Sequence, residues 1–408
     1  MSNKKVLFVS GSLGLGHVGR DIEIAIALRE IEPKIEIFWL AEEPAKSILV
    51  QAGEDMLSEA ELLVSGNAKL ERAARKYSAN LVRITASMLK GWSKNAKLVA
   101  SVVEKMDFDL VIGDETYELP VEMVKDSNFK LFPFVMIYDF IGVDVSSSNP
   151  LDKIYAYAIN RMWAKAMVGG RQFAKKSLFL GEVADVPDKR FGFMLPNRRG
   201  LALKTVDFVG HVLPFDPDEF KNKSEVRKLL GYGEERLVIC SIGGTSAGKD
   251  LLDLCVKAYP FMKKAIPDLK LVLVCGPDVS PSSVYVPEGV EVKGFVPELF
   301  KHLAAADLAI VTGGGTLTLE LTVLQRPFLY FPLQNHFEQE VAVANRCARY
   351  RAGVKMNFAQ TSPEKLAEIV LQTIDKNVTF ASVPVDGAKN VARLISQVLR
   401  EETCATYL

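Results

Sequence analysis

Apolar runs and helix-like segments alternate along most of the chain. The first apolar run covers residues 5–10 and leads through a glycine-containing loop into a segment whose apolar residues recur with a period near 3.6. A second apolar run follows at 35–40. Mainly apolar runs of this length are typical of parallel strands covered on both faces, and strand, helix, strand is the order of a βαβ unit. The pattern therefore predicts that the chain opens with a parallel α/β domain.

The same pattern starts again in the second half, where the run at 237–241 ends in another glycine loop at 242–248. Further predicted strands lie at 108–114, 131–139 and 206–210 in the first half, and at 271–275, 290–293, 308–311 and 328–331 in the second. A polar, proline-bearing stretch at 214–224 separates the halves. We therefore expect two doubly wound α/β domains, at 1–213 and 214–385, followed by a closing helix within 386–408.

One stretch in the second half carries the most information about function. A buried strand at 308–311 is joined to a helix by the three glycines of 313–315. Glycines let the backbone approach a ligand, and the start of a helix offers free N–H groups and a positive dipole end to a phosphate. We expect Thr316 and Thr318 to cap this helix and Glu320, one turn further on, to hold a ribose diol. The alternative is a turn that needs glycine only for packing.

The sequence that follows gives this loop a context. After the helix come an apolar run at 327–332, a polar run at 333–339 that ends in Glu-Gln, and a helix containing Asn345. This order resembles the glycosyltransferases that use nucleotide sugars on the GT-B scaffold, above all the UDP-glycosyltransferases and the MurG-like enzymes. The resemblance is specific over 291–353 and elsewhere rests on layout. It implies two Rossmann-like domains facing across a cleft, with the last helix crossing back to the first domain.

By this resemblance, the second domain binds the nucleotide sugar. The implied residues are Ser241, Gly243, Gly244, Thr245, Thr312, Gly314, Gly315 and Thr316 for the diphosphate, Phe295, Val296 and Glu320 for the base and ribose, and Glu338 and Gln339 for the sugar. Phe295 would stack on the base, and Val296 would bond it through its backbone. Taken singly, each residue has a structural alternative: Phe295 as core, Thr245 as a helix cap, Glu338 as a surface charge.

The first domain offers a histidine and an acid. His17 lies in the loop after the first strand, and Asp114 ends another predicted strand at the same edge of the sheet, where ligands of such sheets bind. In UDP-glycosyltransferases a histidine and an acid in these places form a pair in which the acid orients the imidazole. The resemblance therefore implies that His17 deprotonates an acceptor hydroxyl. In MurG-like members the same loop contacts the acceptor's phosphate, and both roles stay open. The other residues expected on the acceptor side are Gly14, Gly16, Tyr138 and Asp139.

Together these residues predict an inverting, metal-independent glycosyltransferase. It would move a hexose or N-acetylhexosamine from a UDP-sugar, or another NDP-sugar, to an acceptor hydroxyl. We expect no cofactor and no metal, because the chain has no Asp-x-Asp motif and no His/Cys cluster with ligand spacing. Two alternatives remain: a UDP-sugar 2-epimerase on the same scaffold, and an NAD-dependent oxidoreductase that uses Gly14 to Gly19, which fit G-x-G-x-x-G.

The amino-acid composition limits which classes of partner and which cellular compartment are expected. The 408 residues are enough for two domains, and the 50 Lys and Arg balance the 50 Asp and Glu, so the overall charge does not point to nucleic acid. Five cysteines without a CxxC pair suggest reduced thiols. No apolar run near the start is long enough for a signal peptide, and none approaches the roughly 18 residues of a membrane span. We therefore expect a cytoplasmic protein that could meet a membrane only at its inner surface.

Two predicted helical stretches are rich in basic residues. Residues 66–105 carry nine Lys or Arg against two Glu, and 151–176 combine Lys and Arg with Tyr155, Tyr157 and Trp163. One interpretation is an ordinary solvated helix face. The other is a surface for an anionic membrane or a phosphate-bearing acceptor. The expected partners are thus a nucleotide-sugar donor, an acceptor that is a small molecule or a lipid, and peripherally an anionic membrane.

Overall fold

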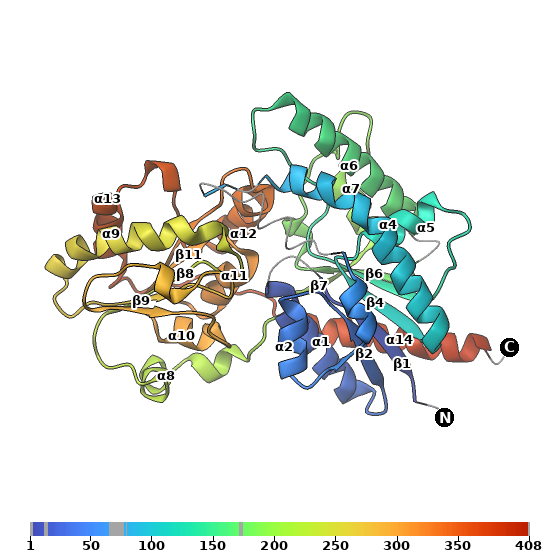
Figure 1. Ribbon diagram of the computed structural model, residues 1–408, viewed down its shortest axis with the longest axis horizontal. Coiled ribbons are helices and arrows are strands. Elements are labelled where there is room, and N and C mark those ends of the chain that lie inside the picture. The colour runs from blue at the N-terminus through green and yellow to red at the C-terminus, as the bar shows by residue number, and fades with distance from the viewer. Residues whose placement is uncertain (1–2, 12–14, 65–76, 79, 171–173, 407–408) are drawn as a thin grey trace. The chain divides into compact units, whose positions relative to one another are not determined.

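The computed structural model describes residues 3–11, 15–64, 77–78, 80–170 and 174–406, and its elements are shown in Figure 1. The chain divides into two compact units. Unit 1 comprises Met1–Leu70, Leu81–Pro214 and Pro384–Leu408, and unit 2 comprises Glu71–Asn80 and Phe215–Val383. Each unit contains one parallel sheet with helices, and this confirms the predicted fold class.

The sheet of unit 1 has seven strands in the order β3-β2-β1-β4-β5-β6-β7. These are β1 (Lys5–Val9), β2 (Glu36–Leu40), β3 (Asp55–Met56), β4 (Leu110–Asp114), β5 (Phe134–Tyr138), β6 (Lys176–Leu180) and β7 (Asp207–Gly210). From β1 the chain first builds outward to β2 and β3, and then returns to place β4 on the other side of β1. The switch point of this sheet, where such folds bind ligands, is therefore between β1 and β4.

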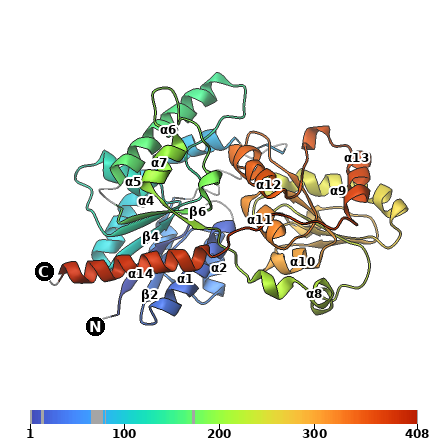
Figure 2. The ribbon, with the colours of Figure 1, turned by 180° about the vertical axis from the view of Figure 1, so that it is seen from behind.

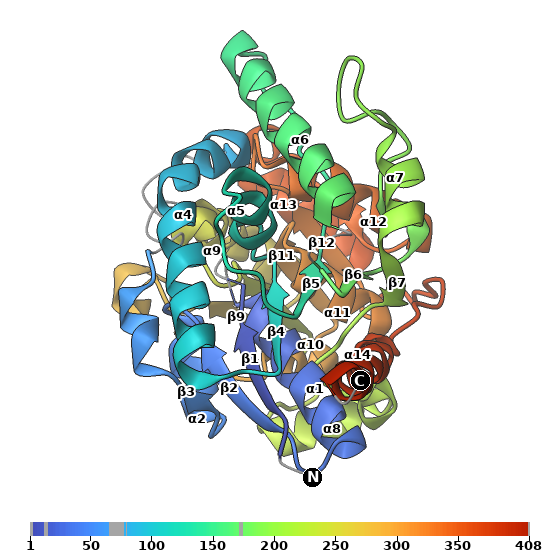
Figure 3. The same ribbon diagram turned by 90° about the vertical axis from the view of Figure 1, so that its right-hand side faces the viewer.

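Helices cover both faces of this sheet, as Figure 3 shows. The helices are α1 (Gly16–Ile31), α2 (Ala45–Gln51), α4 (Leu81–Met106), α5 (Glu118–Lys125), α6 (Pro150–Gly170), α7 (Arg198–Thr205) and α14 (Gly387–Thr406). Side chains alternate along each strand, so Val135 and Ile137 of β5 join the core beneath α1 and α14. Met136 and Tyr138 of the same strand face α5 and α6 instead.

The last helix belongs to unit 1, although the chain reaches it from unit 2. In Figure 2, α14 lies along α1, and its buried residues Val391, Ile395 and Val398 join the core of unit 1. Ser396 donates a hydrogen bond of 2.5 Å to Glu32 at the end of α1, and Arg400 pairs with the same carboxylate at 2.9 Å. The crossing back that the resemblance implied is therefore present.

The sheet of unit 2 has six strands in the order β10-β9-β8-β11-β12-β13. Its strands are β8 (Leu237–Ser241), β9 (Lys270–Val274), β10 (Val290–Lys293), β11 (Leu308–Thr312), β12 (Phe328–Phe331) and β13 (Val354–Lys355). Its helices include α8 (Lys223–Leu230), α9 (Lys249–Ala265), α10 (Leu299–Ala305), α11 (Gly315–Val323), α12 (Ala344–Tyr350) and α13 (Pro363–Thr373). By the same topological rule, its switch point is between β8 and β11.

A short segment from the first half of the sequence packs on unit 2. The Tyr77 hydroxyl donates to the carbonyl of Phe331 at 2.8 Å, and the Tyr77 ring stacks on Phe358 with centroids 4.0 Å apart. Ser78 forms an isolated parallel bridge with Gln334. The sequence prediction placed this segment in the first domain. Tyr77 and Ser78 belong to no repeating apolar pattern, so the sequence alone does not indicate which domain they contact.

Three predicted elements differ in extent from the observed ones. The basic helix expected over 151–176 ends at Gly170, and Lys176 already begins β6. The strand expected over 131–139 begins only at Phe134, since Pro133 before it has no N–H for the ladder. Within 57–106, the described residues form a short 3-10 helix (Ser58–Leu62) and α4, and residues 65–76 lie outside the described part of the chain.

We predict that truncating the interface between α14 and the rest of unit 1 destabilises the protein. Ile395 is fully buried, so Ile395→Ala should lower the free energy of unfolding by about 2–5 kcal/mol in urea denaturation. The exposed neighbour Gln397 provides the control, since Gln397→Ala should change it by less than about 0.5 kcal/mol. Equal effects of the two substitutions would show that α14 contributes little to unit 1.

Candidate functional site

Two glycine loops meet at the switch point of unit 2. The loop after β8 approaches Thr312, the last residue of β11, so closely that a Cβ on Gly248 would lie 2.6 Å from the Thr312 methyl group. Gly276, at φ +71°, would bring a Cβ to 2.3 Å from the carbonyl of Gly243. The Thr312 hydroxyl donates to the carbonyl of Ile242 at 3.3 Å. These close approaches explain why glycine occupies positions 248 and 276, and they leave Thr312 buried between the two loops.

The start of α11 carries no side-chain cap. Its N-cap residue is Gly314, and no described side chain accepts a hydrogen bond from the first N–H groups of the helix. The expectation that Thr316 and Thr318 cap it is wrong: the Thr318 hydroxyl donates backwards, to the carbonyls of Gly314 at 2.8 Å and Gly315 at 3.1 Å. The N–H groups that a cap would satisfy are thus left to a ligand, and the helix dipole favours an anion there.

Glu320 lies on α11, one turn past its start. Its side chain is 5% exposed and has no hydrogen-bonding partner among the described residues. Because burial disfavours the charged form, the pKa of Glu320 is raised to about 8. A buried carboxyl group without a partner is costly, and hydroxyl donors from a ligand would remove that cost.

Glu338 and Gln339 begin a π-helical turn (Glu338–Val343) that leads into α12. Gln339 is buried, and its Oε1 accepts a hydrogen bond from the backbone of Leu333 at 2.9 Å, which leaves its NH₂ group to donate. A carboxylate oxygen of Glu338 lies 3.5 Å from the position that a Cβ on Gly315 would take. The predicted sugar-binding pair is therefore held beside the predicted diphosphate loop.

Arg346 is a feature of this site that the sequence analysis missed. It lies on α12, and its guanidinium donates to the carbonyl of Gly315 and contacts the Thr318 hydroxyl at 3.3 Å. Its Nη2 and a carboxylate oxygen of Glu338 lie 3.6 Å and 3.5 Å from the position that a Cβ on Gly315 would take, so both charged groups lie beside the start of α11. A cation beside the positive end of a helix is favourable only when an anion is also present. The sequence did not predict this position of Arg346, because a π-helical turn separates it from the Glu-Gln pair.

The other predicted donor residues occupy the same edge of the sheet of unit 2. Phe295 and Val296 follow β10. The Val296 side chain packs on the core of the unit, which leaves its backbone as the contact group, whereas the Phe295 ring is 41% exposed and free to stack. Thr245, beside Gly244 in the first loop, precedes a single 3-10 turn and does not cap it.

In unit 1, the structure brings His17 and Asp114 together at the switch point. His17 is the second residue of α1, and its Nδ1 lies 2.7 Å from Oδ2 of Asp114, the last residue of β4. Asp114 is fully buried. A Cβ on Gly11 would lie 3.0 Å from both of these atoms, so only glycine leaves room for the pair at this turn.

Arg20 and Glu115 complete a charged cluster around the imidazole. Arg20, one turn beyond His17, pairs with Asp139 at 2.8 Å and lies 3.5 Å from Asp114. Burial by itself lowers the pKa of His17, but the carboxylates of Asp114 and Glu115 outweigh it and the opposing charge of Arg20, and raise that pKa to about 10. The raised pKa favours a protonated imidazole at neutral pH, and its Nδ1 lies 2.7 Å both from Oδ2 of Asp114 and from Nη2 of Arg20.

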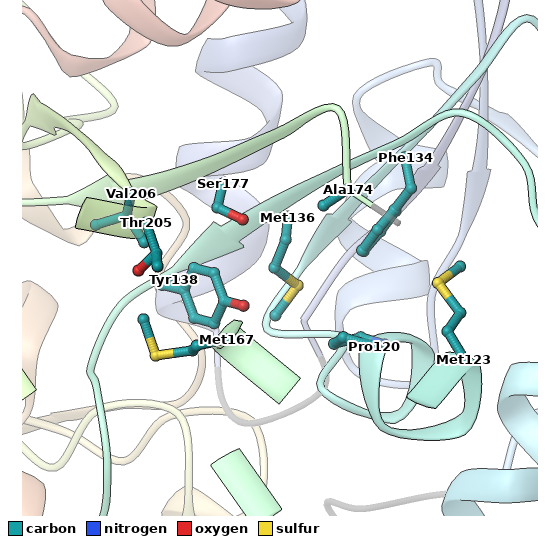
Figure 4. Close-up of a pocket in the computed structure, with 10 residues that line it drawn as sticks. All are labelled: Pro120, Met123, Phe134, Met136, Tyr138, Met167, Ala174, Ser177, Thr205 and Val206. Carbon is teal, nitrogen blue, oxygen red and sulfur yellow. The ribbon is translucent and has the colours of Figure 1, made fainter. Parts of the chain in front are cut away.

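The remaining acceptor-side residues lie in different surroundings. Gly16 begins α1, and Asp139 forms the ion pair with Arg20. Gly14 lies outside the described residues. Tyr138 points to the other face of the sheet, into an apolar pocket shown in Figure 4. That pocket is lined by Pro120, Met123, Phe134, Met136, Tyr138, Met167, Ala174, Ser177, Thr205 and Val206. Burial raises the pKa of Tyr138, so its hydroxyl stays neutral.

Comparison of the whole chain with solved structures identifies its fold. It is similar to the glycosyltransferase of kitacinnamycin (TM-score 0.58, 16% identity, covering 99% of this chain and 95% of that one). It is also similar to MurG of Acinetobacter baumannii (TM-score 0.52, 13% identity, covering 98% and 99%). At these identities the likeness concerns the fold alone. The predicted GT-B scaffold is thereby confirmed.

Sequence relatives point to the same class. Residues 238–398 match the glycosyltransferase family 28 C-terminal domain. The chain is 26% identical over 196 residues to an uncharacterised glycosyltransferase of Methanopyrus kandleri, covering 48% of this chain and 55% of that protein. It is 23% identical over 180 residues to the UDP-N-acetylglucosamine–N-acetylmuramyl-(pentapeptide) pyrophosphoryl-undecaprenol N-acetylglucosamine transferase of Carboxydothermus hydrogenoformans, covering 42% and 47%. The chain thus matches about half the length of these curated relatives, and the predicted resemblance to MurG-like glycosyltransferases is confirmed at that level.

The buried carboxyl group of Glu320 predicts a distinctive dependence of stability on pH. Its pKa is about 8 in the folded protein and near 4.5 in the unfolded chain, so the folded state binds the proton more tightly. Raising the pH from about 5 to 8 should therefore lower the free energy of unfolding of the wild type relative to that of Glu320→Gln, because only the wild type must keep a buried carboxyl protonated. Urea denaturation at several pH values measures this, and parallel curves for the two proteins would contradict it.

Proposed function

We propose that the chain is an inverting glycosyltransferase that transfers a hexose or N-acetylhexosamine from a UDP-sugar, or another nucleoside diphosphate sugar, to an acceptor hydroxyl. The observation that carries the proposal is the pairing, on α11, of an uncapped helix start with a buried, unpartnered carboxyl group one turn away. A nucleoside diphosphate carries both an anion, its diphosphate, and a diol, its ribose. The diphosphate would satisfy the helix start, and the ribose hydroxyls would satisfy the carboxyl group. The relatives support this, since the Carboxydothermus hydrogenoformans protein is by name a UDP-N-acetylglucosamine transferase.

On the donor side, the proposal gives each group a separate task. The diphosphate would lie against the first N–H groups of α11, with Gly244, Thr245, Thr312, Gly314, Gly315 and Thr316 around it. Arg346 would add a full positive charge to the helix dipole, and both would stabilise the diphosphate as it leaves. Glu320 would accept from the ribose, Phe295 would cover the base, and Glu338 with Gln339 would bind the sugar hydroxyls. This arrangement stabilises the leaving group through the protein's own charges.

On the acceptor side, the proposal uses the cluster of His17 and Asp114. An acceptor hydroxyl loses its proton to this cluster, and the oxygen attacks the anomeric carbon while the bond from that carbon to the diphosphate oxygen breaks. Attack from the face opposite the leaving group inverts the anomeric configuration. Around His17 the cluster supplies two carboxylates, that of the buried Asp114 and that of Glu115, together with an imidazole held in place.

The two alternative functions are less well supported. A 2-epimerase would share the scaffold, but the sequence relatives of known name are glycosyltransferases. An oxidoreductase would need the loop of Gly14 to Gly19 for a dinucleotide. Within that span the described residues 16–19 already form the first turn of α1, and His17 is bound to Asp114.

The donor side predicts a specific loss of nucleotide affinity. Isothermal titration calorimetry with UDP should show binding to the wild type and, for Glu320→Ala, a dissociation constant raised roughly 10- to 100-fold, as expected when buried hydrogen bonds to the ribose are lost. Glu364→Ala, on the exposed surface of α13, is the matched control and should bind like the wild type. Equal affinity in wild type and Glu320→Ala would remove the donor-site assignment.

We also propose that unit 1 contacts an anionic membrane and that the acceptor is a lipid or is linked to one. No helix among the described residues combines the length and apolarity that would let it cross a bilayer. The exposed side of α6, however, is both apolar and basic: it carries Leu151, Lys153, Ile154, Tyr155, Tyr157, Arg161 and Lys165. The loop before α7 packs on it through a hydrogen bond of 3.3 Å from Tyr157 to the carbonyl of Phe193. Aromatic and aliphatic groups with flanking cations suit the interface of an anionic bilayer.

Liposome sedimentation tests this surface. Phe193 and Met194 are 80% and 81% exposed, so replacing both by serine should not disturb the fold, and it should reduce binding to vesicles that contain phosphatidylglycerol. The control is Tyr285→Ser, which removes an equally exposed aromatic ring from unit 2. The wild type should bind at low salt and less at high salt, because the charge attraction is screened. Failure of the wild type to bind anionic vesicles at low salt would defeat this part of the proposal.

A further inference from the structure

Two consecutive acids lie on opposite sides of the His17 ring. Asp114 faces Nδ1 at 2.7 Å, and Oε2 of Glu115 lies 3.4 Å from Nε2. Neighbouring residues reach both ring nitrogens because Glu115 takes a left-handed backbone conformation, φ +50°, just after β4 ends. Non-glycine residues adopt this conformation at a cost, and such strain is concentrated at functional sites. In a simple histidine and acid pair only Nδ1 would face a carboxylate, whereas here a second carboxylate lies near Nε2 as well.

The Glu115 carboxylate is held firmly in this place. The Tyr117 hydroxyl donates to its Oε1 at 2.9 Å, and its backbone N–H donates to the carbonyl of Ile137 at 3.0 Å. The side chain is 7% exposed. Only Oε2 is directed at the imidazole, so the two carboxylate oxygens have different tasks: one fixes the group, and the other faces the site.

A third acid closes the arrangement. A ring nitrogen of His17, an oxygen of Glu115 and an oxygen of Asp139 all lie within 4.8 Å of one another. Asp139 is neutralised by Arg20 at 2.8 Å, whereas Glu115 has the imidazole in front of it and a tyrosine hydroxyl behind. Because Nε2 of His17 and Oε2 of Glu115 are 3.4 Å apart, a single hydroxyl oxygen could contact both atoms.

We propose that Glu115 is a further catalytic residue and takes the proton of the acceptor hydroxyl. The inference rests on the proposed glycosyl transfer. The O–H bond of the acceptor breaks, and its proton passes to Oε2 of Glu115. The electron pair left on the oxygen forms the bond to the anomeric carbon, and the bond to the diphosphate oxygen breaks. His17, with Nδ1–H on Asp114, directs Nε2–H at the acceptor oxygen and stabilises the charge that develops there.

The electrostatics agree with this division of work. The carboxylates flanking His17 raise its pKa to about 10, so near pH 7 it already carries the proton that a general base would have to accept. The groups facing Glu115 are His17 and Arg20 from α1, Asp114 before it, Tyr117 after it and Asp139 beyond β5. The Oε2 atom of Glu115 is the oxygen of that carboxylate that faces the charged ring, 3.4 Å from its Nε2.

The hydrolysis of UDP-sugars tests the proposal without knowledge of the natural acceptor, because water can take the acceptor's place. The full chain would be given UDP-glucose, UDP-galactose and UDP-N-acetylglucosamine, and UDP release measured. Glu115→Gln should lower kcat roughly 10²–10⁴-fold and leave the affinity for UDP unchanged. Glu104→Gln, an exposed carboxyl on α4 that pairs with Lys130, should match the wild type. Formate should restore part of the rate to Glu115→Ala, as a small carboxylate can replace a missing base but cannot repair a fold.

The pH profile separates the two candidate bases. If Glu115 accepts the proton, kcat of the wild type should not follow the titration of His17 between pH 7 and 9. A base with the pKa of His17 would instead make kcat rise about 100-fold between pH 7 and pH 9. A rising profile, or full activity of Glu115→Gln, would overturn the role of Glu115 and leave the proposed function intact.

Two further outcomes would also overturn it. If EDTA abolishes turnover and a divalent cation restores it, then His17, Glu115 and Asp139 hold a metal ion, and Glu115 is not the base. If the wild type neither binds UDP nor hydrolyses any UDP-sugar, the proposed function itself fails and takes this inference with it. Calorimetry with UDP on Glu115→Gln tells the cases apart, because the donor residues belong to unit 2 and should be unaffected.

Discussion

The order of strands in two parallel sheets determines where all the chemistry of this chain can occur. Each sheet is built outward from one strand and then resumed on that strand's other side, so β1 and β4 in unit 1, and β8 and β11 in unit 2, send the loops at their carboxyl ends to opposite faces. His17 and Asp114 lie at the first of these points, and the loops around Thr312 lie at the second. Close approach at both points requires glycine, at Gly11 and at Gly248.

The two sites use buried charge in opposite ways. In unit 2 the polar groups are incomplete: α11 begins without a side-chain cap, Arg346 lies against the start of that helix, and the carboxyl group of Glu320 is buried. Such groups gain most from a ligand that supplies an anion and hydroxyl donors. In unit 1 the charges are crowded instead, and a protonated imidazole lies between Asp114 and Glu115. The first arrangement suits binding, and the second suits the transfer of a proton.

Much of this could be predicted from the sequence, because it depends on local patterns. Uncharged apolar runs revealed the strands, and the glycine loops with Glu320 and the Glu-Gln pair revealed the donor site. Contacts between distant segments could not be predicted in this way. Arg346 reaches Gly315 only through a π-helical turn, and Tyr77 joins unit 2 without any periodic signal. Glu115 was visible beside Asp114, but its place across the ring depends on a left-handed backbone conformation. The caps expected from Thr316 and Thr318 are absent, and the Thr318 hydroxyl donates backwards to Gly314 and Gly315 instead.

The central claim is that a nucleoside diphosphate binds at the start of α11. A crystal structure of the protein with UDP tests it most directly. We predict that the diphosphate oxygens accept hydrogen bonds from the backbone N–H groups of Gly315 and Thr316, with the guanidinium of Arg346 turned toward them and the ribose hydroxyls on Glu320. UDP bound elsewhere, or bound with Glu320 still unpartnered and the start of α11 empty, would contradict the account.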